Sequence, residues 1–110
     1  MRKQEPVADD ADQTTSVTRN DDESRYEIRV GGTLAGFVAF RQKPGRLSFT
    51  HTLIEPEFEG LGLGSVLVRS ALDDVVASGD TIVPYCTFVQ SWLKRHPEFE
   101  GTVDWKPVQQ

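Results

Sequence analysis

The sequence predicts an α+β fold, in which an antiparallel meander of strands leads into a β-α-β unit and a short C-terminal helix. Apolar and polar residues alternate in residues 26–30 and 46–54, which is typical of half-buried strands, and residues 33–41 between them are rich in apolar side chains. The period then changes to that of an amphipathic helix over residues 63–78. A glycine-rich run at residues 60–64 joins the two patterns.

The first three strands follow one another through short turns. Tyr26, Ile28 and Val30 alternate with polar residues, and two glycines then form a tight turn of the kind that joins antiparallel strands. Residues 33–41 form the second strand, which the Lys-Pro-Gly sequence at 43–45 ends. The third strand covers residues 46–54, and its alternation predicts one shared face for Leu47, Phe49, His51 and Leu53.

The helix predicted at residues 63–78 ends at Gly79, which is suited to a left-handed cap. A short strand over residues 81–86 follows, and a second helix over residues 87–96 stops at Pro97. The third and fourth strands should be parallel neighbours, because a helix connects them by a right-handed crossover.

Composition divides the 110 residues into a leader and one domain. Residues 1–22 carry six acidic and three basic side chains and few large apolar ones, so we expect a disordered acidic leader there and a compact domain over residues 23–110. A chain with a net charge of −5 is not expected to bind nucleic acid nonspecifically. It has no apolar run long enough for a membrane, no signal peptide and a single cysteine, which indicates a cytoplasmic protein without disulfides.

The glycines at positions 60, 62 and 64 precede the long helix, where free backbone N–H groups can receive a phosphate. A dinucleotide-binding G-x-G-x-x-G pattern fails from either starting glycine, because Ser65 and Leu67 occupy the sixth position. A nucleotide-triphosphate loop also fails, since no G-K-[ST] follows.

A different pattern fits this loop. The run Ile54-x-Pro56-x-x-Glu59-Gly60-x-Gly62-x-Gly64 resembles the acetyl-CoA pyrophosphate loop of the GNAT superfamily of N-acetyltransferases, usually written [RQ]-x-x-G-x-[GA]. With His51-Thr52, Pro84-Tyr85-Cys86 and Arg95-His96-Pro97, the chain is similar to the small single-domain branch of that superfamily over residues 25–99. The resemblance implies a GNAT-like fold and transfer of an acetyl group from acetyl-CoA to an amine.

The resemblance also implies the cofactor-binding residues. A backbone N–H around Leu53 to Glu55, including Ile54, would stabilise the oxyanion. The diphosphate would lie against Glu59, Gly60, Leu61, Gly62, Leu63, Gly64 and Ser65. Ser65 either donates its hydroxyl or caps the helix locally. Glu59 departs from the family pattern, because its carboxylate stands where Arg or Gln is usual and repels a diphosphate.

Three residues are candidates for catalysis. His51 is either a general base or a partly buried structural histidine, and Glu55 is either a proton relay or a solvated loop charge. Cys86 is a small buried hydrophobe, a residue lining the pantetheine groove or a covalent nucleophile, and we favour contact over covalency. The tyrosine that many family members use as general acid corresponds to Trp92, so that role stays unassigned. The histidines and the cysteine lack metal-ligand spacing.

The sequence thus predicts an N-acetyltransferase in which an acceptor amine attacks acetyl-CoA directly. The alternative is a non-catalytic module that binds or senses CoA or acyl-CoA, which Glu59 and Trp92 support. The acidic residues Glu55 and Glu57 favour a cationic acceptor. The chain is too short to include a second domain for acceptor specificity, so we expect an acceptor groove that is either open or completed by a protein partner.

Overall fold

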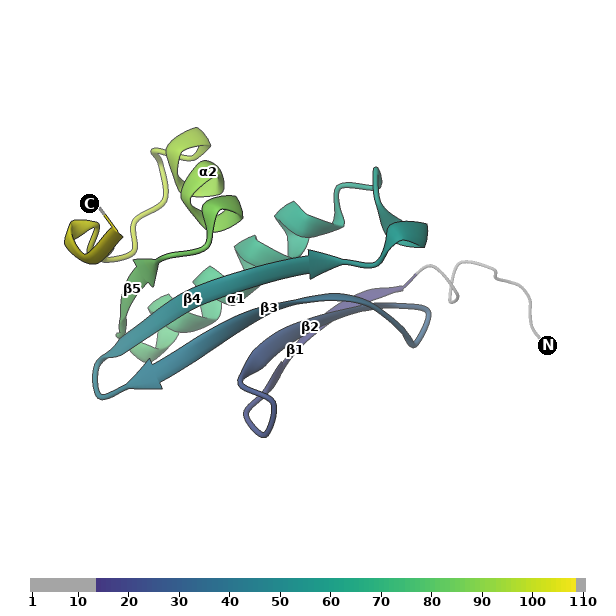
Figure 1. Ribbon diagram of the computed structural model, residues 1–110, viewed down its shortest axis with the longest axis horizontal. Coiled ribbons are helices and arrows are strands. Elements are labelled where there is room, and N and C mark those ends of the chain that lie inside the picture. Colours follow the sequence, from purple (N-terminus) through teal and green to yellow (C-terminus); the bar gives the residue numbers. More distant parts are fainter. Residues whose placement is uncertain (1–13, 109–110) are drawn as a thin grey trace.

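The computed structural model describes residues 14–108, which form a five-stranded sheet with two helices (Figure 1). The strand order is β1-β2-β3-β4-β5; neighbours are antiparallel from β1 to β4, and β4 and β5 are parallel. This arrangement confirms the predicted meander, β-α-β unit and C-terminal helix. The elements are β1 (Thr15–Asn20), β2 (Arg25–Val30), β3 (Thr33–Lys43), β4 (Arg46–Ile54), η2 (Pro56–Phe58), α1 (Leu63–Ser78), β5 (Thr81–Pro84), α2 (Thr87–Arg95) and η3 (Lys106–Val108).

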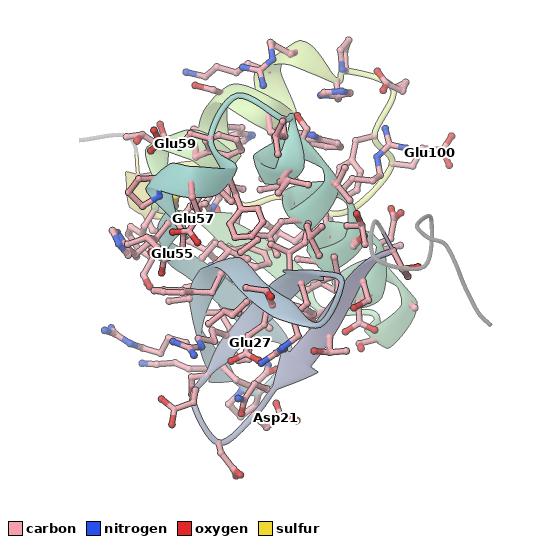
Figure 2. All side chains as sticks on the ribbon, turned by 90° about the vertical axis from the view of Figure 1, so that its right-hand side faces the viewer. Asp21, Glu27, Glu55, Glu57, Glu59 and Glu100 are labelled. Carbon is pink, nitrogen blue, oxygen red and sulfur yellow. The ribbon has the colours of Figure 1, made fainter. Side chains whose placement is uncertain are left out.

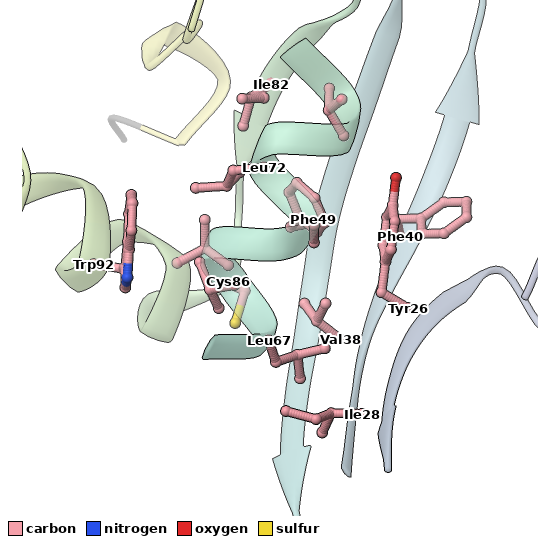
Figure 3. Packing of buried hydrophobic residues seen from close by; sticks show 14 of the residues in the cluster. Tyr26, Ile28, Val38, Phe40, Phe49, Leu67, Leu72, Ile82, Cys86 and Trp92 are labelled. Atoms are coloured by element: carbon pink, nitrogen blue, oxygen red, sulfur yellow. The ribbon is translucent and has the colours of Figure 1, made fainter. Parts of the chain in front are cut away.

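A single apolar core lies between one face of the sheet and the two helices (Figure 3). Helix α1 contributes residues at helical spacing, such as Leu67, Ala71 and Val75, which are fully buried. Helix α2 adds Trp92, whose side chain is 1% exposed. Val66 and Val76 of the same helix are exposed and lie outside its buried stripe. None of the helices within residues 14–108 has the length and apolarity needed to cross a membrane.

The predicted leader is wrong over its last part, because Thr15–Asn20 forms the edge strand β1. Val17 packs against the core, and the Arg19 guanidinium lies 4.6 Å from the centre of the Phe40 ring. Arg19 also donates a hydrogen bond of 3.2 Å to the Tyr26 hydroxyl, which in turn donates to Asp74 on α1 at 2.7 Å. The low average hydrophobicity of residues 1–22 concealed these contacts. Residues 1–13 lie outside the described part of the chain.

The strand β4 contains a bulge that the sequence alternation did not predict. Ala39 pairs with His51 and Phe40 pairs with Phe49, so Thr50 has no residue opposite it. An extra residue in one strand reverses which side chains face the core beyond that point. Phe49 therefore faces the core, whereas His51 lies on the opposite face, 6.1 Å from Phe37 between ring centres.

The shared face predicted for the third strand is consequently wrong in its second half. Leu53 pairs with Phe37 on the face away from the helices, and His51 is exposed, not partly buried. The predicted fourth strand was also too long. It ends at Pro84, and Cys86 is the N-cap residue of α2.

On the face away from the helices, a network of ion pairs surrounds Glu27. Its carboxylate accepts hydrogen bonds from Arg25 at 2.8 Å, Arg29 at 2.9 Å and Asn20 at 3.1 Å, and the residue is 4% exposed. The hydrogen bond from Arg25 contributes most to lowering the pKa of Glu27 to about 2, against the burial, which disfavours the charged form.

We expect this depressed pKa to make stability depend on pH. A carboxylate whose pKa is lower in the folded state stabilises the fold above the unfolded pKa of 4.5, and this contribution is lost as the pH falls toward about 2. The Glu27→Gln variant should therefore be less stable than wild type by roughly 2 kcal/mol at pH 6, with the difference shrinking at pH 3. Urea unfolding at both pH values measures this. Glu98→Gln, which removes a surface pair at 3.6 Å, is the control. A difference for Glu27→Gln that is independent of pH would contradict the prediction.

Candidate active site

The glycine loop directly precedes α1, and no side chain caps the first turn of this helix. Gly60 and Gly62 have φ angles of 84° and 77°, and no side chain caps the helix at Gly62. The first intrahelical hydrogen bond runs from Val66 N–H to the Gly62 carbonyl at 3.4 Å. The preceding N–H groups thus lie at the positive end of the helix dipole without an intrahelical acceptor, which is a suitable site for an anion.

A cavity of about 390 Å³ connects this helix terminus with the end of β4. One wall is the loop and the first turn of α1, another is the end of β4, and a third is the side chain of Phe88 from α2. The lining residues are Thr52, Ile54, Phe58, Glu59, Gly60, Gly62, Leu63, Gly64, Ser65 and Phe88. The cavity is therefore polar where the helix begins and apolar along its sides.

The strands β4 and β5 separate at the inner end of this cavity. They pair as far as Phe49 and Pro84, and the Cys86 N–H then donates to the Phe49 carbonyl at 2.9 Å. Beyond this point the Thr52 hydroxyl and the Cys86 thiol, 3.0 Å apart, are the next contact between the two chain segments. The remainder of β4 faces the cavity without a neighbouring strand on that edge.

Backbone direction selects Ile54 from the predicted oxyanion donors. The Glu55 N–H donates to the Ala35 carbonyl of β3 at 2.8 Å, so it is not available to a ligand. Successive backbone N–H groups of a strand point to opposite edges. The Ile54 N–H therefore points to the edge that β5 has left, and Ile54 also lines the cavity.

The structure brings most of the predicted loop residues to the cavity, with the exception of Leu61, whose side chain is 65% exposed and does not line it. Glu59 lines the rim and is exposed. Figure 2 shows Glu55, Glu57 and Glu59 along one side of the loop. None of these three carboxylates forms an ion pair within the described residues.

The catalytic candidates lie on two sides of β4. His51 is exposed on the face away from the helices, whereas Glu55 follows the end of β4 and is the N-cap residue of η2. Cys86 is buried, 7% exposed, at the point where β4 and β5 separate. Trp92 is buried in the core and has no hydroxyl to donate, whereas Tyr85 is 48% exposed. Residues 14–108 contain no group of three or more His, Cys, Asp or Glu side chains that would hold a metal.

Sequence reasoning missed three residues of the cavity: Thr52, Phe58 and Phe88. The alternation predicted for residues 46–54 places Thr52 on the face opposite to Phe49, because it does not include the bulge at Thr50. Phe58 and Phe88 are aromatic residues beside the loop and in the first turn of α2, and neither position has a sequence signal of its own. Only their approach to the glycines in three dimensions identifies them.

The geometry agrees with comparisons to known proteins. A family model described as GCN5-related N-acetyl-transferase matches residues 25–102. The structure is similar to the crystal structure of a ribosomal-protein-alanine N-acetyltransferase from Brucella melitensis biovar Abortus 2308, with a TM-score of 0.51 and 22% identity. The match covers 74% of this chain and 63% of that longer one. A search of curated proteins found no match. Because the family model covers most of the chain, the protein belongs to the GCN5-related N-acetyltransferase family.

Proposed function

We propose that the protein transfers an acetyl group from acetyl-CoA to an amine. The observation that carries this proposal is that one cavity joins the uncapped N-terminus of α1 to the separated end of β4. The helix terminus suits the diphosphate of CoA, and the end of β4 suits its thioester. The apolar side walls suit the pantetheine arm that connects the two groups.

The chemistry needs one polarised carbonyl and two proton transfers. The lone pair of the neutral amine attacks the thioester carbon, and the Ile54 N–H stabilises the negative charge on the oxygen. The carbon–sulfur bond then breaks, the amine nitrogen loses a proton, and the CoA thiolate gains one. His51, on the face that the helices leave open, and Glu55, directly after the end of β4, are the candidates for accepting the proton. Cys86 does not itself line the cavity, and it supports the lining residue Thr52, whose hydroxyl lies 3.0 Å from its thiol.

The acceptor that fits best is a cationic amine, such as a polyamine or a lysine side chain. Glu55, Glu57 and Glu59 lie together on the loop without ion-pair partners among residues 14–108, and so attract positive charge toward the site. The rival function is a non-catalytic CoA-binding module. The observation that favours it is Trp92, which is buried where many family members carry an acidic tyrosine.

One experiment separates the two functions. Purified protein is titrated with acetyl-CoA by calorimetry, and free thiol is then followed with spermidine, a lysine peptide and a neutral amine as acceptors. We expect binding and acceptor-dependent thiol release, fastest with the cationic amines. Binding without acceptor-dependent release would establish the non-catalytic module. The absence of any binding would overturn both functions.

The Glu59 carboxylate on the rim should weaken this binding. Its replacement by glutamine removes a negative charge near the diphosphate, and we expect the Kd for CoA to fall by about threefold at low ionic strength. The gain should vanish in about 0.5 M salt, because the site is exposed and the interaction is screened. Glu57→Gln is the matched control, since Glu57 is exposed on the same loop but does not line the cavity. Equal affinities of Glu59→Gln and wild type at low salt would contradict this prediction.

A further inference from the structure

The third glycine of the loop differs from the other two in its surroundings. Gly60 and Gly62 have positive φ angles, and a side chain added at either would meet nothing within 4 Å. Gly64 lies in the first turn of α1 and has no positive φ. A methyl group at Gly64 would lie 2.5 Å from Cζ of Phe88 and 3.1 Å from its Cε2. The missing side chain of Gly64 therefore provides the space that the Phe88 ring occupies.

Phe88 is only partly packed by this contact. It belongs to the first turn of α2, directly after the segment that contacts β4 through Cys86, and it lines the cavity together with Gly64 and Ser65. Its side chain remains 37% exposed, although large aromatic residues stabilise a fold most when they are buried. The ring thus presents an apolar surface to the cavity beside the free N–H groups of α1.

We propose that Phe88 is a positioning residue for CoA and that Gly64 is glycine in order to admit its ring. The ring forms the side wall against which the pantetheine arm packs, between the diphosphate at the helix terminus and the thioester at β4. This inference rests on the proposed function, since it takes CoA as the ligand. It assigns the glycine to contact between α1 and α2, and not to close approach of the diphosphate.

The proposal predicts strong coupling between the two positions. Gly64→Ala should weaken CoA binding about fivefold, because the methyl group displaces the ring from the cavity wall. Phe88→Ala should weaken it about fivefold through loss of the apolar wall. In the double variant the methyl group meets no ring, so its loss of affinity for CoA should equal that of Phe88→Ala alone. Calorimetric titration of all four proteins with CoA measures this cycle. The proposal would be overturned if the fold-increase in the Kd for CoA of the double variant were the product of the fold-increases of the two single variants.

A second probe separates the pantetheine arm from the diphosphate. ADP carries a diphosphate but no pantetheine, so Phe88→Ala should change its Kd by less than twofold while changing that of CoA about fivefold. If Phe88→Ala weakened the binding of ADP and of CoA equally, the ring would lie against the nucleotide, and its assignment to the pantetheine arm would be wrong. Failure of wild type to bind CoA would instead refute the proposed function, so the two failures are distinguishable.

Unfolding without ligand gives an independent test. Alanine is the better helix former, so Gly64→Ala should raise the urea midpoint when residue 88 is already alanine. With Phe88 present, the same substitution should lower the midpoint, because the ring must move. A change of the same sign in both backgrounds would show that the ring and the glycine are independent, and would overturn the proposal.

Discussion

Replacing Gly62 by alanine is expected to weaken CoA binding by at least tenfold. Gly62 is the N-cap residue of α1 with a φ angle of 77°, a conformation that costs an alanine about 1–2 kcal/mol. The chain relieves this cost by moving the loop, which turns the first N–H groups of α1 away from the diphosphate. Calorimetric titration with CoA measures the loss of affinity, and urea unfolding measures the loss of stability.

Gly45 provides a matched control for this substitution. It lies in the turn between β3 and β4 with a φ angle of 73°, and a side chain there would also meet nothing within 4 Å. Gly45→Ala should therefore cost similar stability, while its Kd for CoA stays within twofold of wild type. If the two variants lost equal affinity, binding would depend on overall stability and not on the geometry of the α1 terminus.

The largest effect on stability is expected for Trp92→Ala, at about 3–5 kcal/mol. The Trp92 ring stacks on His96 with centres 3.9 Å apart, contacts Phe99 edge-on at 5.9 Å, and lies 5.1 Å from the Arg69 guanidinium. Its removal leaves a cavity among α1, α2 and the segment that follows. A protein of this size has a total stability of roughly 5–15 kcal/mol, so the melting temperature should fall by about 15 °C or more.

Trp105→Ala is the control for the loss of a tryptophan. Trp105 is half-buried at the edge of the core, where the Lys94 ammonium lies 5.7 Å from its ring centre. We expect a cost of about 1–2 kcal/mol, because less apolar area is buried there. Urea unfolding compares the two variants at equal protein concentration. Equal losses of stability would show that Trp92 does not organise the packing of α2.

The local elements were predictable because their signals are local. Glycines at 60 and 62 precede the helical period of α1, Gly79 follows it, and Pro97 ends the region of α2. Turn residues likewise delimited β3 and β4. The limits of β4 and α1 were predicted correctly from these signals alone, and the glycine spacing excluded the dinucleotide and triphosphate loops.

The placement of side chains around the site was not predictable in the same way. His51 and Thr52 exchange faces because Thr50 is an extra residue opposite Ala39 and Phe40, and a bulge depends on the partner strand. The edge strand β1 exists because Arg19 and Val17 find partners on β2, β3 and the core. Neither feature leaves a periodic signal in its own segment.

The sequence by itself determined the order of strands and helices from β2 to α2, the glycine loop and the family resemblance, because turn chemistry and periodicity act within a few residues. The tertiary structure decided which side of β4 each candidate occupies, that the Ile54 N–H points to the open edge, and that Phe88 fills the space beside Gly64. The physical reason is that strand register, edge pairing and close packing depend on residues far apart in the chain.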